Sequence, residues 1–140
     1  MLVTLLIPVL NEEQSIPTLC GKLGAVIDSM PEEHFEVVFV DDGSTDQTVS
    51  AIQRIAWPRD TRCKVISLAR NFGHQNALTA GYEYASGDVI VCLDADLQDP
   101  PEMIPLFLEK YREGYDVVYG IRTNRKEAWW MRVCFKAFYR

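Results

Sequence analysis

The stretch CLDADLQDPPE, residues 92–102, places Asp94 and Asp96 one residue apart at the end of an apolar run. On an extended chain these two carboxylates point to the same side, and Gln98 continues that side if the extension persists. Oxygen ligands of this kind suit a hard divalent cation, Mg2+ or Mn2+, with water or substrate completing the coordination. The stretch therefore predicts a cation site facing a phosphorylated ligand; the alternative is a solvated acidic strand end.

Two other interpretations of this aspartate pair fail on residue position. An EF-hand calcium loop needs D-x-[DN]-x-[DN]-G, but Gln98 and Asp99 occupy its fifth and sixth places. Haloacid-dehalogenase-type phosphatases carry D-x-D after the first strand, where this chain has PVLNEE. The cation site facing a phosphorylated ligand is therefore retained.

A second acidic pair, Asp41 and Asp42, opens the stretch DDGSTD directly after an apolar run. A turn at Gly43 and a helix cap at Ser44 or Thr45 would explain the small residues without any function. A turn and a helix cap do not explain why two carboxylates are adjacent. An aspartate at a strand end can accept hydrogen bonds from a base or from ribose hydroxyls, so we expect at least one of the two to bind a ligand.

The elements that must position these residues alternate along the chain. Apolar runs predict strands, and amphipathic stretches predict the helices between them. This alternation predicts an α/β fold with a Rossmann-like, mostly parallel sheet and helices on both faces. The strands are expected at 2–10, 35–40, 63–68, 88–93 and 115–120, and the helices at 12–30, 44–56, 74–85 and 100–114.

Polar segments follow all five predicted strands. In a parallel sheet these segments share the carboxyl edge, which is where ligands bind. They read PVLNEE, DDGSTD, ARNFGHQN, DADLQD and GIRTNR. The first has no glycine, which excludes the G-x-G-x-x-G dinucleotide motif, and no P-loop is present. A sugar-nucleotide pyrophosphorylase would carry a glycine-rich, basic first loop, whereas this one is acidic.

Bulk composition narrows the function further. The chain has 140 residues, room for one domain, and no apolar run of the roughly 18 to 20 residues that span a bilayer. The first residues lack a basic region and a cleavage site, so a buried first strand is expected rather than a signal peptide. Four scattered cysteines indicate a reducing compartment and no zinc site.

Charge is unevenly distributed. Residues 122–140 carry six basic side chains and one acidic, whereas residues 1–121 carry eight basic and nineteen acidic. An acidic body argues against a nucleic-acid partner. It must nevertheless hold an anionic ligand, and we expect a divalent cation together with Arg70, Arg122 and Arg125 to balance that charge.

The basic tail predicts a membrane contact. On a helix, Arg132, Lys136 and Arg140 form one stripe beside an apolar face with aromatic borders. Core packing could use the apolar face alone, but the basic stripe and the aromatics favour an interfacial helix on an anionic membrane surface. The expected contacts are Trp129, Trp130, Arg132, Lys136 and Phe138.

The motifs PVLNEE, VDDGSTD, RNFGHQNAL and DADLQDPPE, in this order, resemble glycosyltransferase family 2 and its GT-A fold. DADLQDPPE after RNFG is most similar to the branch that transfers hexoses to polyprenyl (dolichyl or undecaprenyl) phosphates. The resemblance covers essentially the whole chain. It divides the chain into a nucleotide-sugar-binding core at 1–121 and a basic acceptor loop with an interfacial helix at 122–140.

The resemblance implies a metal-dependent, inverting transfer of a hexose from a nucleotide-sugar, of the UDP-glucose or GDP-mannose type, to a polyprenyl phosphate. It implies that Asp94 lies near the ribose and the metal and that Asp96 and Gln98 are metal ligands. The residues expected at the nucleotide are Pro8, Glu12, Asp41, Asp42, Arg70 and Asp94. The catalytic residues expected from the motifs and charges are Asp94, Asp96, Arg122 and Arg125.

The resemblance also implies that the protein acts at the cytoplasmic side of the membrane. Family members usually continue with further catalytic elements and carboxyl-terminal transmembrane helices, so this chain is expected to be an amino-terminal catalytic portion. A naturally short chain would need a partner or a homo-oligomer. A family 2 enzyme with a saccharide acceptor and a catalytically incomplete nucleotide-sugar-binding fragment are the alternatives.

Overall fold

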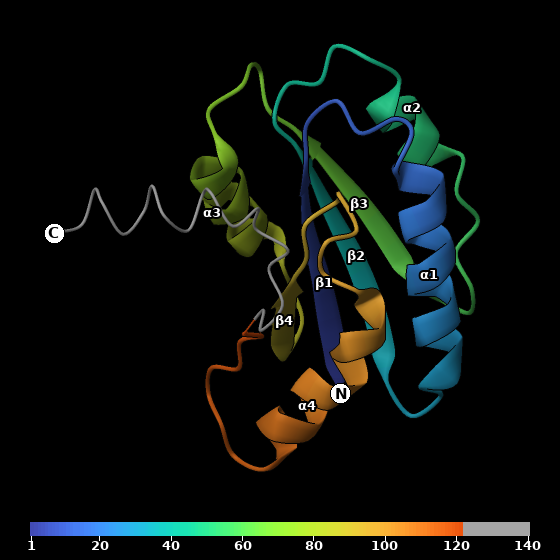
Figure 1. Ribbon diagram of the computed structural model, residues 1–140, viewed down its shortest axis with the longest axis vertical. Helices are drawn as coiled ribbons and strands as arrows, with labels where there is room; N and C mark the ends of the chain where they lie inside the picture. The colour runs from blue at the N-terminus through green and yellow to red at the C-terminus, as the bar shows by residue number, and fades with distance from the viewer. Residues whose placement is uncertain (122–140) are drawn as a thin grey trace, which may run out of the picture.

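The computed structural model describes residues 1–121, in which a four-stranded parallel sheet lies between helices (Figure 1). The strand order is β3-β2-β1-β4. The strands are β1 (Leu2–Val9), β2 (His34–Asp41), β3 (Arg62–Ser67) and β4 (Val89–Cys92). The helices are α1 (Ile16–Ser29), α2 (Thr48–Gln53), α3 (His74–Tyr84), the 3-10 helix η1 (Pro101–Met103) and α4 (Ile104–Arg112). None of the helices described within residues 1–121 is long and apolar enough to cross a bilayer.

Helices cover both faces of the sheet, as the near-continuous apolar strands predict. One face of β1 and β2 packs against α1, α2 and α4 in the larger core, which includes Leu5, Phe39 and Leu19. The other face packs against α3 through Leu6, Val38, Val40 and Ala77. Figure 1 shows α3 on one side of the sheet and α1 and α2 on the other. The expected α/β architecture is confirmed.

The strand order places a topological switch point between β1 and β4. The chain builds outward from β1 to β2 and β3, and then returns to add β4 on the other side of β1. The crossover from β3 to β4 carries α3 on the face opposite to α1 and α2, and this change in direction places a crevice at the carboxyl ends of β1 and β4. The two acidic motifs of the sequence end at this edge.

The helix predicted at 44–56 is shorter, and its predicted caps are wrong. α2 begins at Thr48, whose N–H is bound by Asp46 Oδ1 at 2.9 Å. Ser44 Oγ instead accepts the Asn11 N–H at 2.9 Å, and the Thr45 N–H donates to Asn11 Oδ1 at 2.8 Å. These residues fasten two neighbouring loops together, so they are not available to cap the helix.

The strand predicted at 115–120 is absent from the described structure. Val117 is 78% exposed and Tyr119 is 76% exposed, so this apolar run is not buried on a sheet face. Strand preference in such residues depends on packing against neighbouring strands. Within residues 1–121, β4 pairs only with β1, and the segment after α4 forms no ladder with it.

A buried polar cluster anchors the connection from α3 to β4. Glu36, 2% exposed, accepts hydrogen bonds from Thr4 Oγ1 at 2.6 Å and from the Ser86 N–H at 2.5 Å, and it pairs with Lys64 at 3.0 Å. The Gly87 N–H donates to Thr4 Oγ1 at 2.9 Å. Burial alone would raise the pKa of Glu36, but the bonds from Thr4, Ser86 and Lys64 together lower it below its ordinary value.

This cluster predicts a loss of stability in acid. Because the pKa of Glu36 is lower in the folded state, its contribution is complete above the unfolded value of about 4.3 and is lost as pH falls through the folded pKa. Glu36→Gln is expected to lower the free energy of unfolding at neutral pH by about 1–3 kcal/mol and to flatten the acid dependence. Urea denaturation across pH measures both, with the exposed Glu32→Gln as control. An unaltered acid dependence would contradict this assignment.

Candidate functional site

A cavity of about 500 Å³ opens at the carboxyl ends of β1, β2 and β4. It lies at the switch point of the sheet, where open α/β folds bind ligands. The walls come from the loops after all four strands and from the start of α3. The lining residues are Pro8, Val9, Leu10, Glu12, Asp42, Asn71, Gly73, His74, Ala77, Asp94, Ala95 and Asp96.

The cavity is strongly acidic. Four carboxylates line it, those of Glu12, Asp42, Asp94 and Asp96, and no lysine or arginine within residues 1–121 does so. An anionic ligand would be repelled by such a wall unless a cation accompanied it or basic side chains entered from elsewhere. The wall composition therefore favours a ligand that arrives with a cation.

The acidic motif after β4 forms a turn, so the predicted extension to Gln98 is wrong. Leu97 has a φ of +62°, which reverses the chain. The Gln98 N–H donates to Asp96 Oδ1 at 3.0 Å, and the Gln98 side-chain amide donates to Asp96 Oδ2 at 2.7 Å. Gln98 thus orients the Asp96 carboxylate and lies outside the lining of the acidic cavity. Its role as a metal ligand stays a prediction.

The donor set fits a magnesium-type cation. Asp94 and Asp96 both line the acidic cavity, and the Asp94 side chain is 44% exposed. Mg2+ is usually held by one or two carboxylates together with waters and substrate phosphates, so a dedicated protein cage is not needed. Residues 1–121 contain no group of three His, Cys, Asp or Glu side chains that could hold a metal by themselves.

The two aspartates after β2 have different environments. Asp41 lies outside the lining, and its Oδ1 accepts the Ser44 N–H at 3.0 Å. Asp42 lines the cavity, and its two oxygens accept the N–H groups of Phe72 at 2.7 Å and Gly73 at 2.9 Å. Only one of the pair therefore reaches the cavity, and its oxygens already bind backbone.

The loop after β1 forms a second wall of the cavity, and hydrogen bonds hold it to the loop before α2. Pro8 and Glu12 line the cavity, and their contact with a nucleotide stays a prediction. The Glu12 N–H donates to Thr48 Oγ1 at 2.8 Å, and Glu13 exchanges hydrogen bonds with the loop before α2. Asn11, with a φ of +55°, binds Ser44 and Thr45 of that same loop. These contacts tie the loops after β1 and β2 into one unit.

The loop after β3 contributes cavity residues that were not predicted from the sequence. Asn71, Gly73 and His74 line the cavity, whereas Arg70 is exposed and stacks on the Phe72 ring, with its guanidinium 4.6 Å from the ring centroid. His74 begins α3, as expected, and its Nε2 lies 3.9 Å from Asp94 Oδ1. The position of RNFGHQN after a strand was the available signal for these residues.

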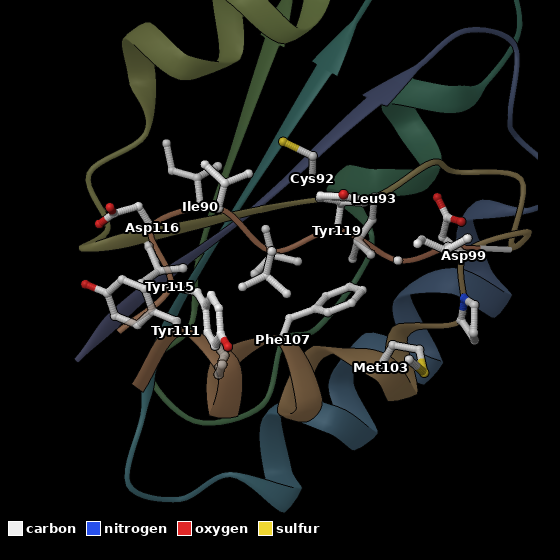
Figure 2. A pocket seen from close by; sticks show the side chains of 18 of the residues that line it. Ile90, Cys92, Leu93, Asp99, Met103, Phe107, Tyr111, Tyr115, Asp116 and Tyr119 are labelled. Carbon is white, nitrogen blue, oxygen red and sulfur yellow. The ribbon is translucent and has the colours of Figure 1, made fainter. Parts of the chain in front are cut away.

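A second cavity of about 620 Å³ lies on the other side of the acidic turn, against the outer side of β4. Figure 2 shows Phe107, Tyr111, Tyr115 and Tyr119 around it, together with Ile90 of β4. Its lining is largely apolar and aromatic and also includes Gln98 and Asp99. The segment mispredicted as a fifth strand forms one of its walls.

Several predicted site residues fall outside the described residues. Arg122 and Arg125, expected at a phosphate, belong to this group, as do the predicted membrane contacts. Those contacts are Trp129, Trp130, Arg132, Lys136 and Phe138.

Comparisons with known proteins agree with this fold. A family model described as "Glycosyl transferase family 2" matches residues 4–133. The uncharacterized glycosyltransferase YkcC of Bacillus subtilis (strain 168) is 45% identical over 138 residues, which are 98% of this chain and 42% of the relative. An undecaprenyl-phosphate 4-deoxy-4-formamido-L-arabinose transferase of Pseudomonas syringae pv. syringae (strain B728a) is 43% identical over 130 residues, 93% of this chain and 38% of the relative.

Solved structures show the same fold. A mannosyltransferase from Pyrobaculum calidifontis, in complex with GDP-Man and Mn2+, matches 67% of this chain and 27% of its own at 32% identity and a TM-score of 0.53. Glucosyl-3-phosphoglycerate synthase from Mycobacterium tuberculosis matches 78% of this chain and 40% of its own at 25% identity and a TM-score of 0.62. The expected GT-A fold is confirmed by these likenesses. The chain spans about two fifths of the length of the curated relatives described above.

Proposed function

The chain belongs to glycosyltransferase family 2, and from that premise we propose that it transfers a hexose from a nucleotide-sugar to a polyprenyl phosphate at the cytoplasmic side of the membrane. The observation that carries the proposal is the acidic cavity at the switch point, which brings Asp94 and Asp96 to one wall. Relatives named as undecaprenyl-phosphate sugar transferases support the acceptor class. We propose inversion at the anomeric carbon, since a single displacement by the acceptor inverts it.

The donor is proposed to bind with Mg2+ or Mn2+. Asp94 and Asp96 would hold the cation, and the solved relative with GDP-Man and Mn2+ supports this pairing of ligands. When bound, the cation would neutralise charge on the departing nucleoside diphosphate. Pro8 and Glu12 form the wall proposed for the nucleoside, and Arg122 and Arg125 are proposed at a donor or acceptor phosphate.

The proposed acceptor does not require a general base. A phosphate monoester has its second pKa near about 6, so it is already an anionic nucleophile at neutral pH. A saccharide hydroxyl has a far higher pKa and would need a carboxylate to take its proton. In this proposal the carboxylates Asp94 and Asp96 hold the cation, which leaves the phosphate acceptor as the simpler partner.

A donor screen tests the proposed function. Membranes that contain the protein would be incubated with radiolabelled UDP-glucose, GDP-mannose or nucleotide-linked 4-deoxy-4-formamido-L-arabinose. A hexose donor is expected to yield a labelled, chloroform-soluble lipid. Labelled lipid from the arabinose donor alone would show that the transferred sugar is this arabinose and not a hexose. The absence of labelled lipid with every donor would contradict the proposal.

The proposed membrane contact has its own test. Charge reversal at Arg132 and Lys136 is expected to reduce flotation with vesicles that contain anionic lipid, since each basic residue near such a surface contributes about 1 kcal/mol. Reversal of Lys22 and Arg54, which lie in the acidic body, serves as a matched control. An unchanged floating fraction in the tail variant would favour packing of this segment within the protein.

A further inference from the structure

The cavity wall formed by residues 71–74 is held by a buried carboxylate from a different loop. Asp42, 4% exposed, receives the Phe72 N–H on one oxygen at 2.7 Å and the Gly73 N–H on the other at 2.9 Å. Hydrogen bonds to an ionised acceptor are shorter and about twice as strong as neutral ones. A single carboxylate therefore holds two consecutive peptide groups about thirty residues away in sequence, and the Gly73 N–H is shared with Asn71 Oδ1 at 2.9 Å.

Gly43 makes this contact possible by letting the two loops approach closely. It has a φ of +81°, which favours glycine. A Cβ at this position would lie 2.6 Å from Arg70 C and 2.7 Å from Asn71 N, distances that backbone atoms cannot accommodate. The pair Asp42–Gly43 thus reaches over the loop after β3 with both a side-chain and a backbone contact; we refer to it as the latch.

The segment held by the latch carries three cavity-lining residues, Asn71, Gly73 and His74. Gly73 immediately precedes α3, so fixing its N–H also fixes where that helix begins. His74 then lies with Nε2 3.9 Å from Asp94 Oδ1, next to the proposed cation position. Movement of the wall would change the space between His74 and the acidic turn.

We infer that Asp42 is a positioning residue: it holds the wall 71–74 against the nucleotide cavity and does not itself recognise the nucleoside. This inference rests on the proposed function for the identity of the ligand. It replaces the sequence-based prediction that Asp42 contacts the nucleoside, because both of its oxygens accept backbone hydrogens and the residue is only 4% exposed.

Removal of the Asp42 charge would have opposite effects under electrostatics alone and under a positioning role. The cavity is lined by carboxylates, so loss of one negative charge should strengthen binding of a nucleoside diphosphate. Asp42→Asn keeps the shape of the side chain but turns an NH2 group toward one of the two N–H donors. The positioning role therefore predicts weaker binding, and the sign of the change separates it from a simple charge effect.

The experiment combines hydrogen exchange of the free protein with calorimetric titration of UDP and GDP in the presence of Mn2+. Asp42→Asn is expected to speed exchange at the Phe72 and Gly73 amides by about tenfold or more while the β1 amides stay protected. The affinity for the nucleotide that the unmodified protein binds is expected to fall by about tenfold. Asp88→Asn is the control, since it removes the same charge at the opposite edge of the sheet and keeps an oxygen that can accept the Leu2 N–H.

Two results would overturn the inference. Weaker binding with unchanged exchange at Phe72 and Gly73 would make Asp42 a direct ligand contact. Faster exchange with equal or tighter binding would show that the wall does not position the site. If the variant fails to fold, hydrogen exchange of the unmodified protein still tests whether the latch holds the wall. Phe72 and Gly73 amides that exchange as fast as those of an unstructured peptide would contradict the latch. Failure of the unmodified protein to bind either nucleotide would instead contradict the proposed function.

Discussion

Replacement of Asp96 by alanine is expected to lower the Mn2+-dependent affinity for a nucleoside diphosphate by about 100-fold or more, since even outer-shell partners of metal sites contribute 10–100-fold. Asp96 is an exposed carboxylate at the cavity wall, oriented by two hydrogen bonds from Gln98. Without a cation the same variant should bind the nucleotide as well as or better than the unmodified protein, because a negative charge has been removed. Calorimetry with and without Mn2+ measures both effects.

Two companion variants make this result specific. Asp96→Asn retains an oxygen for the Gln98 N–H but loses the charge, so we expect it to resemble the alanine variant if cation binding is the function of Asp96. Asp60→Ala removes an exposed carboxylate from the loop before β3, at the opposite edge of the sheet, and should change nothing. Equal Mn2+-dependent affinity in all three proteins would mean that the metal site is misassigned.

Gly43→Ala is expected to give the largest loss of stability among single substitutions at the site, about 2–5 kcal/mol. A left-handed φ contributes about 1–2 kcal/mol for a residue with a Cβ, and forced overpacking contributes about 1–3 kcal/mol. Both apply here, because φ is +81° and the added atom would lie 2.6 Å from the Arg70 backbone. Urea or thermal denaturation measures the change in the free energy of unfolding.

Gly114→Ala separates these two contributions. Gly114 also has a positive φ, +100°, but no atom lies within 4 Å of the position its Cβ would take. This control should therefore show the conformational loss alone, about 1–2 kcal/mol. Equal losses in the two variants would indicate that the loops after β2 and β3 do not press against each other at Gly43.

The sequence predicted those features that depend on local pattern. Alternating apolar runs and amphipathic stretches placed four strands and most of the helices, because buried parallel strands and helix faces leave a clear periodicity. The polar segments after those strands correctly identified the edge of the sheet on which the cavity lies. Asp94 and Asp96 could be assigned to that edge because they directly follow an apolar strand.

The features that sequence could not predict depend on contacts between loops distant along the chain. Ser44 and Thr45 resemble helix caps locally, but Asn11 binds both of them. Asp41 and Asp42 are adjacent and identical, and only the loop after β3 distinguishes them. A left-handed φ at Leu97, a residue that rarely adopts it, ends the extension that would have continued the side of Asp94 and Asp96 to Gln98.

The run 115–120 shows the limit of apolar pattern as a signal. Its valines and tyrosines satisfy strand preference, yet the described segment contributes only to the wall of the second cavity. A strand needs a partner for its backbone groups and a covered face for its side chains. Neither requirement can be read from the run itself.

The central claim, that a lipid phosphate accepts the sugar, is tested most directly by comparing acceptors with one active radiolabelled donor. Undecaprenyl phosphate, undecaprenol and a free saccharide would be offered in turn to the protein in vesicles with Mn2+. We predict chloroform-soluble label with undecaprenyl phosphate alone, because only that acceptor presents an anionic oxygen at neutral pH. Equal labelling of undecaprenol, or transfer to the saccharide in place of the lipid phosphate, would contradict the account.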